Sequence, residues 1–174
     1  MSISEKLKEL KDRVSDGSIF PYEPRRRKAK RRIYLYKQAV KDLNDPSSAF
    51  GVLNLQPQLA NVLEIWVTGG RVWTDANRKP RFLKPIYPPS PDVWEMMMIE
   101  PRAQVRIFSL FAEPDTIFVS HMRTRAFLGK KGSQNWIDAK QYCWSTFINL
   151  FEVNPFKSPS IHDYVTENCD DFAC

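Results

Sequence analysis

The apolar residues in the first half of the chain recur at helical spacing. Those within residues 3–14 predict a short helix that ends at the Asp-Gly-Ser of residues 16–18. Residues 19–24 hold two prolines and two aromatic residues and are expected to be extended. Residues 58–68 predict another helix, ended by Gly69 and Gly70. Between them, a helix is predicted for residues 25–43, because its apolar positions advance by three or four residues: Ala29, Ile33, Tyr36, Val40 and Leu43.

The second half has a different pattern. Three strand-length apolar runs, at residues 93–100, 104–111 and 116–122, are separated by short clusters of turn-forming residues. Consecutive strands joined by short turns predict an antiparallel meander. Five prolines within residues 71–92 argue against long regular structure there. Residues 134–151 predict a C-terminal helix capped by Ser133, and a polar tail follows it.

These patterns predict an α+β fold, in which N-terminal helices pack on a small antiparallel β-meander followed by a C-terminal helix. We expect a helical N-terminal part with a basic run in residues 1–50, and an α+β core with a polar tail in residues 51–174. Together they should form one compact domain, because 174 residues can bury a core without staples.

Cysteine and histidine usage and hydropathy limit the class of protein. The three cysteines have no Cys-x-x-Cys spacing and lie far from His121 and His162 in all but one case, so we expect no metal site and no cofactor. Free thiols favour a reducing compartment. No stretch approaches the roughly 20 apolar residues that span a bilayer. We therefore expect a cytoplasmic location and no membrane partner.

The positive charge of the chain is concentrated in one run. The chain has 26 basic and 20 acidic residues, and seven of the basic residues lie in this run. The rest of the chain therefore has 19 basic residues, one fewer than its acidic residues. Such a run suits phosphate binding through Coulomb attraction and counterion release. The alternatives are a solvated face compensated by carboxylates, or an arm that orders only on binding. We predict nucleic-acid contacts from Arg25, Arg26, Arg27, Lys28, Lys30, Arg31 and Arg32.

A second group of cations follows the third predicted strand. Arg102 and Arg106 precede it, and they share a face if the strand between them is regular. Arginine suits such a face because its planar guanidinium presents several donors to phosphate oxygens. The residues that follow the strand complete the group: His121, Arg123, Arg125, Lys130 and Lys131.

This group also permits a reaction. Cleavage of RNA by its own 2′-hydroxyl needs charge stabilisation at phosphorus more than a protein nucleophile, so arginine can carry much of the catalysis. His121 or Tyr87 could move a proton, although a lone histidine at a strand end is more often a hydrogen-bonded structural residue. Arg123 and Arg125 could instead protect an edge strand. Motifs for nucleotide hydrolysis and for metalloproteases are missing.

Several aromatic residues lie beside basic ones in the sequence. Such rings could stack on nucleic-acid bases, and the alternative is packing in the core. They are Tyr34, Tyr36, Trp73, Phe82 and Phe127.

The order of segments 92–96, 104–108 and 116–121, followed by basic residues and a helix, resembles the RelE/HigB-like toxin superfamily. The sequences Trp-Glu-Met and Val-Arg-Ile-Phe are similar to the family's Tyr/Trp-Glu-Leu-Arg and Tyr-Arg-Ile-Phe core. Members pack a helical N-terminal part on an antiparallel sheet and cleave messenger RNA, commonly on the ribosome. The resemblance spans residues 92–143 and implies that Arg106 is the phosphate-binding arginine, with Arg123 and Arg125 near the second basic position. The family's Lys-Lys pair is shifted here to Lys130 and Lys131.

Two functions follow as expectations. The first is an endoribonuclease that works without a metal, through Arg106, Arg123, Arg125 and His121, with RNA held by the basic run. The second is a phage- or plasmid-type protein that binds nucleic acid, an antitoxin or another acidic protein without catalysis. We expect RNA as the partner rather than DNA.

Overall fold

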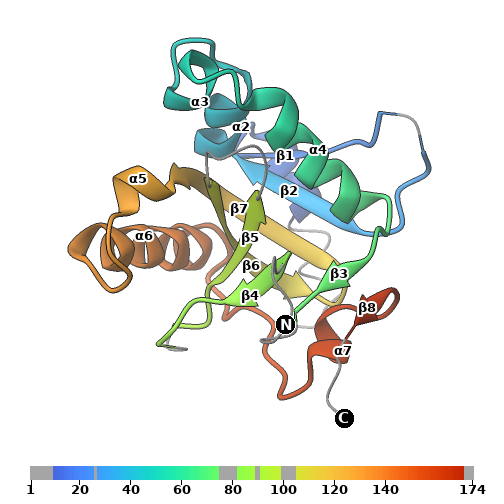
Figure 1. Cartoon of the computed structure of the whole chain (residues 1–174). Helices are drawn as coiled ribbons and strands as arrows, with labels where there is room; N and C mark the ends of the chain where they lie inside the picture. The colour runs from blue at the N-terminus through green and yellow to red at the C-terminus, as the bar shows by residue number, and fades with distance from the viewer. Residues whose placement is uncertain (1–9, 26, 75–81, 89–90, 99–104, 171–174) are drawn as a thin grey trace.

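One six-stranded, mostly antiparallel sheet organises the chain. The computed structural model describes residues 10–25, 27–74, 82–88, 91–98 and 105–170. The strand order in the sheet is β1-β2-β7-β6-β5-β4, and helices lie against it from several sides (Figure 1). The mixed α and β composition that the sequence predicts is therefore confirmed. The six strands are β1 (Ile19–Pro21), β2 (Arg32–Tyr36), β4 (Leu83–Pro85), β5 (Trp94–Met98), β6 (Val105–Glu113) and β7 (Thr116–Thr124).

The three strands predicted in the second half form an antiparallel meander. β5 pairs with β6, and β6 pairs with β7, both antiparallel. The turn between β6 and β7 contains Asp115 with a φ of 55°, a left-handed conformation that aspartate tolerates better than most residues. Residues 99–104 of the first predicted turn lie outside the described residues. The short strand β4, which the sequence did not predict, adds to the free edge of β5.

The basic run does not form a helix, which corrects the helix predicted for residues 25–43. The described residues between β1 and β2 are irregular, β2 begins at Arg32, and helix α2 (Lys37–Asn44) begins only after it. The side chains of Ile33 and Leu35 are both buried, whereas the side chain of Arg32 is exposed to solvent. Burial of every second residue is typical of a strand. The pairing of β2 with strands on both of its edges therefore outweighs the helical spacing of the apolar residues.

β2 joins the N-terminal part of the chain to the meander. It pairs in parallel with β7, from Arg32 opposite Thr116 to Leu35 opposite Val119, and antiparallel with the edge strand β1. The sheet therefore contains strands from residues 1–50 and from residues 51–174. Because β2 and β7 are parallel, the start of both strands lies at one end of the sheet and the end of β7 lies at the other.

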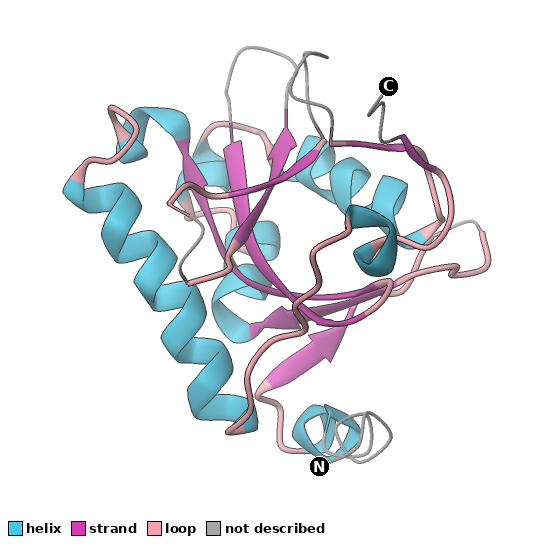
Figure 2. Cartoon of the chain, turned by 90° about the horizontal axis from the view of Figure 1, so that it is seen from below, coloured by secondary structure: helices cyan, strands magenta, loops and turns pink. Residues whose placement is uncertain are grey.

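Helices cover both faces of the sheet. α3 (Ala49–Val52) and α4 (Gln56–Val67) lie with α2 on one side in Figure 1, whereas α6 (Gln134–Phe151) lies along another side in Figure 2. α4 and α6 start and end close to the predicted bounds. Ser133 occupies the N-cap position of α6, but its hydroxyl donates to the Leu128 carbonyl instead of capping.

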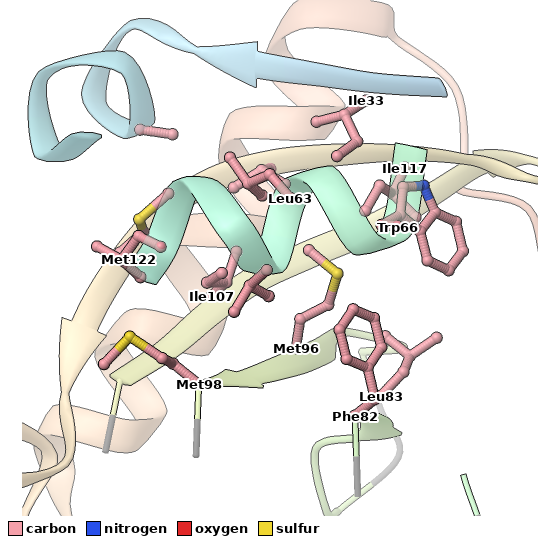
Figure 3. Packing of buried hydrophobic residues seen from close by; sticks show 14 of the residues in the cluster. Ile33, Leu63, Trp66, Phe82, Leu83, Met96, Met98, Ile107, Ile117 and Met122 are labelled. Carbon is pink, nitrogen blue, oxygen red and sulfur yellow. The ribbon is translucent and has the colours of Figure 1, made fainter. Parts of the chain in front are cut away.

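The two faces have separate hydrophobic clusters. Leu63 and Trp66 of α4 pack toward Ile107, Ile117 and Met96 of the sheet (Figure 3). On the other face, side chains of α6 pack on alternate residues of β6 and β7 in a second cluster that includes Phe108, Leu110, Phe118, Trp136 and Phe147. Alternation along each strand thus divides the core between two layers of helices.

The remaining elements lie at the ends of the sheet. Residues 10–15 are helical, which agrees with the first predicted helix where the chain is described. The short elements are α5 (Arg125–Leu128), α7 (Ile161–Tyr164), and the parallel pair β3 (Val72–Trp73) and β8 (Cys169–Asp170). None of these was predicted from the sequence.

Candidate nucleic-acid interface

The segment between β1 and β2 exposes a cluster of cations, which we call the basic loop. Its described cations Arg25, Arg27, Lys28 and Lys30 are exposed, and no ion pair joins any of them to a described carboxylate. Arg26, which the sequence analysis also assigned to nucleic-acid binding, lies outside the described residues. The basic loop projects at the right of Figure 1. It leaves four side chains able to meet phosphates in solvent.

Arg31 and Arg32 belong to the framework beneath the basic loop. The Arg31 side chain is 2% exposed, its Nη1 donates to the Gly70 carbonyl at 2.9 Å, and its Nη2 donates to the Glu167 carbonyl. Its Nε lies 3.5 Å from an Asp115 carboxylate oxygen, and its guanidinium lies over the Trp66 ring. Burial lowers the pKa of Arg31 from its ordinary value. This guanidinium is therefore occupied by the protein.

Arg32 is also held from one side. Its Nη2 forms an ion pair with the buried carboxylate of Glu113, while about half of its side chain, 51%, stays exposed. Arg32 can thus contact a ligand only at the edge of the basic loop, and most of its charge is compensated by Glu113.

Backbone hydrogen bonds fix the course of the basic loop. The N–H groups of Lys30 and Arg31 both donate to the Val67 carbonyl, at 2.8 and 3.1 Å. The N–H of Arg25 donates to the carboxylate of Glu64. Gly69, with a φ of +74°, packs so closely that an added Cβ would lie 2.7 Å from Lys30 Cδ. The backbone of the loop is therefore fixed next to the C-terminal end of α4, and the aliphatic part of the Lys30 side chain packs on Gly69.

The second predicted group of cations lies at the end of β7, and we call it the arginine group. Arg106 on β6 and Arg123 on β7 are direct cross-strand partners. Arg125 follows in α5, and its charge lowers the pKa of Arg106, although burial is the larger cause. The guanidinium of Arg123 lies over the Phe127 ring and that of Arg125 over the Trp136 ring. Strand pairing thus brings together Arg106 and Arg123, and α5 places Arg125 near Arg106. The sequence predicted all three arginines as catalytic residues.

Like charges opposite each other in a sheet repel, and a buried carboxylate offsets this repulsion. Glu95, 2% exposed, lies on β5 opposite Phe108, diagonally across from Arg106. Its Oε1 is 3.1 Å from Lys84 Nζ and its Oε2 is 2.8 Å from Arg106 Nε. The last two atoms meet in distance but not in hydrogen-bond alignment, so we treat them as an ion pair. Glu95 therefore neutralises part of the arginine group. Arg123 Nη1 donates to the Met122 carbonyl at 2.7 Å and Arg125 Nη1 donates to the Gly129 carbonyl, so each guanidinium keeps its other N–H donors for a ligand.

His121 is enclosed between the sheet and α6. It is 0% exposed, its ring stacks on Phe108 with centroids 4.7 Å apart, and its Nδ1 lies 2.7 Å from Ser120 Oγ. Burial, with a smaller effect of the Arg123 charge, lowers the pKa of His121 to about 3. Its Nε2 has no hydrogen-bond partner among the described residues. This ring is therefore neutral at ordinary pH and enclosed by protein side chains.

A cavity of about 400 Å³ opens beside Arg123. Beyond Val119 the edge of β7 has no β2 partner, and α2 occupies this place. There Asp42, 5% exposed, accepts hydrogen bonds from the Met122 N–H at 2.9 Å and from Gln38 Nε2 at 2.8 Å. Burial raises the pKa of Asp42. The cavity is lined by residues of α2, α3, β7, α5 and the turn between α2 and α3, which include Lys41, Asp42, Asp45, Ser47, Arg123 and Phe127.

The sequence analysis did not single out Asp42. It lies in a helical stretch with no motif around it, and only the pairing of α2 with the end of β7 places it beside Arg123. Its Oδ2 is 4.0 Å from Arg123 Nη1. No signal in one sequence marks such a meeting, because the two residues are far apart along the chain.

The other candidate residues take different positions. Lys130 and Lys131 are exposed in the turn between α5 and α6, and Lys131 Nζ lies 6.0 Å from the centroid of the Tyr87 ring, itself 73% exposed. Phe127 is 54% exposed, whereas Phe82 is buried. Tyr34 and Tyr36 are half-buried on β2, and Trp73 is 36% exposed. Arg102 lies outside the described residues.

The basic loop and the arginine group lie at opposite ends of the sheet. Arg32, at the end of the loop, pairs with Thr116, and Arg123 follows on the same strand seven residues later. At roughly 3.3 Å per residue this interval is about 23 Å. The two surfaces thus appear on opposite sides in Figure 1.

Within the described parts of the chain, no three metal-ligating side chains gather as a metal site would require. The helices there are also too short or too polar to cross a membrane. No protein-family model matches the chain, and no curated protein or solved structure matches it either.

Proposed function

We propose that this protein binds single-stranded RNA and cleaves it without a metal ion. The observation that carries this proposal is the arginine group, in which Arg106 of β6 lies opposite Arg123 of β7, Arg125 of α5 lies near Arg106, and Arg123 lines an open cavity. Cleavage by the 2′-hydroxyl passes through a phosphorus centre that gains negative charge. Preorganised guanidinium groups would stabilise that charge in the transition state. The resemblance to RelE/HigB-like toxins in residues 92–143 points to the same chemistry.

Each cation has a distinct task in this proposal. Arg123 and Arg125 contact the scissile phosphate, and Arg106, held by Glu95, supplies positive potential from the second strand. Lys130 and Lys131 hold a neighbouring phosphate. The exposed ring of Phe127 stacks on a base, a contact worth about 1–3 kcal/mol in single-strand binders. We leave His121 out of the reaction, because its ring is buried and neutral.

The basic loop would hold the same RNA at a distance from the reaction. Its four exposed cations act through phosphate contacts, which carry affinity and little sequence information. The interval of roughly 23 Å along β7 corresponds to about seven phosphates at the axial rise of about 3.4 Å per phosphate of one duplex strand, so a short RNA segment can reach both surfaces.

A second function is binding without cleavage, as a phage- or plasmid-type protein with a nucleic-acid, antitoxin or other acidic partner. The exposed cations of the basic loop, which form no ion pair with a described carboxylate, favour it, because they need no arginine group to bind a polyanion. The two functions make different demands on the arginine group, and mutation separates them.

The test incubates the purified chain with labelled single-stranded RNA, or duplex DNA, in EDTA, and reads both denaturing and native gels. Cleavage of RNA that persists in EDTA and falls in Arg123→Ala and Arg106→Ala supports the nuclease. Lys11→Ala is the matched control, because this exposed cation lies in the N-terminal helix, outside both surfaces. RNA that is shifted but intact moves the function to binding alone.

Neutralising Arg25, Arg27, Lys28 and Lys30 to glutamine tests the basic loop. The slope of log affinity against log salt should become shallower by about 3, since each lost phosphate contact on a single strand removes about 0.7. Filter binding at several salt concentrations measures the slope. An unchanged slope would remove the basic loop from the interface.

A further inference from the structure

The proposed cleavage requires a group that takes the proton of the 2′-hydroxyl, and the arginines cannot do this because they stay protonated. A candidate base must reach the 2′-oxygen while the phosphate contacts a guanidinium. The side chains beside Arg123 are therefore the place to search. Two carboxylates, Asp42 and Asp45, line the cavity there.

We propose that Asp42 is the general base of this cavity and that Arg123 holds the phosphate next to it. This inference rests on the proposed RNA cleavage. Asp42 Oδ2 and Arg123 Nη1 are 4.0 Å apart, and both residues line the cavity. Nη1 donates to the Met122 carbonyl at 2.7 Å, which holds the guanidinium in place and leaves its other N–H donors for a phosphate. A ribose 2′-hydroxyl and its 3′-phosphate are neighbours on one nucleotide, and this spacing can engage both at once.

Asp42 is held in a fixed orientation for this task. The Met122 N–H occupies Oδ2 and the Gln38 amide occupies Oδ1. A carboxylate has about four lone-pair sites, so each oxygen keeps one for a substrate hydroxyl. The hydrogen bond from β7 and the one within α2 thus prevent rotation of the carboxylate without saturating it.

Asp45 lines the same cavity, but its hydrogen bonds and the direction of its pKa shift differ from those of Asp42. Its Oδ1 accepts hydrogen bonds from both the N–H and the hydroxyl of Ser47, at 2.8 and 2.7 Å. These bonds lower the pKa of Asp45, whereas burial raises that of Asp42. Environments that move the pKa values of two carboxylates apart often mark their separate roles in catalysis. Asp42 is the better proton acceptor of the two.

The step balances as follows. The 2′-hydroxyl gives its proton to Asp42 as the 2′-oxygen forms a bond to phosphorus, and the bond from phosphorus to the 5′-oxygen breaks. The leaving 5′-oxygen takes a proton from water, and Asp42 returns its own proton to solvent. The products are a 2′,3′-cyclic phosphate and a 5′-hydroxyl. Arg123 neutralises charge on the phosphate oxygens throughout.

The closing experiment compares Asp42→Asn with Asp12→Asn, a change at an exposed carboxylate of the N-terminal helix that lies outside the cavity. Asparagine can keep the local structure, because its oxygen can accept from Met122 while its amide donates to Gln38 after that side chain turns over. We expect Asp42→Asn to bind RNA like the parent chain but cleave it at least about 100-fold more slowly, the usual size of a general-base contribution. Asp12→Asn should cleave at close to the parent rate. Equal losses in both variants, or no loss in Asp42→Asn, would overturn the assignment.

A pH profile separates a base from a structural residue. The cleavage rate should fall as pH drops through the pKa of Asp42, whose charged neighbours are Arg123 on β7, Lys41 on its own helix and Asp45 in the following turn. Removing the Gln38 hydrogen bond in Gln38→Ala should shift this limb to higher pH, because that bond lowers the pKa. A limb that stays in place contradicts the inference.

The two levels of the proposal fail separately. If the parent chain binds RNA but leaves it intact in EDTA, the cleavage function fails and the base falls with it. If the parent cleaves and Asp42→Asn cleaves equally well, the function stands and only the assignment of Asp42 is rejected.

Discussion

The basic loop and the arginine group carry similar charge but hold it in opposite ways. In the loop, backbone hydrogen bonds to Val67 and Glu64 fix the chain, and the cationic side chains are exposed. In the arginine group the side chains themselves are held, by Glu95 and by aromatic rings. A seated backbone with free cations suits adaptable contact with phosphates. Fixed guanidinium groups suit a defined geometry, and they cost more to disturb.

The largest expected effect comes from removing the carboxylate at the centre of the arginine group. Glu95→Ala leaves Arg106 and Lys84 without their buried partner, and breaking a buried ion pair in this way costs about 3–5 kcal/mol of unfolding free energy. Urea unfolding measures this loss. The matched control is Glu23→Ala at the base of the loop, an exposed acid that should change stability by less than about 0.5 kcal/mol. A loss below about 1 kcal/mol for Glu95→Ala would show that the arginine group is no more fixed than the loop.

The next effect sharpens the division within the basic run. Arg31→Ala removes charge-assisted hydrogen bonds to the Gly70 and Glu167 carbonyls, each worth about 1.5–3 kcal/mol, so we expect a loss of about 3 kcal/mol. Arg27→Ala, four residues earlier and exposed, should stay within about 0.5 kcal/mol of the parent. Thermal or urea unfolding of both variants provides the comparison. Similar losses of unfolding free energy in Arg31→Ala and Arg27→Ala would contradict the distinction between a structural Arg31 and an exposed Arg27 that is available to a ligand.

The smallest of these effects concerns pH. The pKa of His121 is about 3 in the folded chain, below its ordinary value of 6.5, so the unfolded chain binds the proton between these values. The contribution of neutral His121 to the free energy of unfolding is fully present above about pH 6.5 and is lost as pH falls toward 3. Between pH 7 and pH 5 the free energy of unfolding should fall by about 2 kcal/mol for this reason. His121→Phe should remove this part of the pH dependence, whereas His162→Gln, in exposed α7, should retain it. Urea unfolding at the two pH values decides; an equal pH dependence in parent and His121→Phe contradicts the prediction.

The meander and helices α4 and α6 were predictable because their patterns are local. Each strand is a continuous apolar run with turn residues at its end, and each of these helices has one sustained apolar side. The pairing of β2 was not predictable in this way, since Ile33 fits both a helical stripe and an alternating strand. Its choice depends on Val119 and neighbouring residues of β7, more than eighty positions later.

The same limit applies to the candidate site. The sequence shows a run of seven cations, but it cannot show that Arg31 turns inward, because its acceptors are carbonyls of Gly70 and Glu167. It cannot show that His121 is enclosed by Phe108 and Tyr142, nor that Asp42 meets Arg123. Charge can be counted along a chain, whereas burial and pairing depend on the partners that folding supplies.

The hydrogen bond from Arg31 to Glu167 spans 136 residues, and this has a consequence for the protein during its synthesis. Contacts between residues so distant in sequence form late, because loop closure must precede them. A ribosome-bound chain that ends before residue 167 carries all seven basic residues but cannot complete their anchor. The cations are thus present from the start of translation, while their final arrangement has to wait until nearly all of the described chain has emerged.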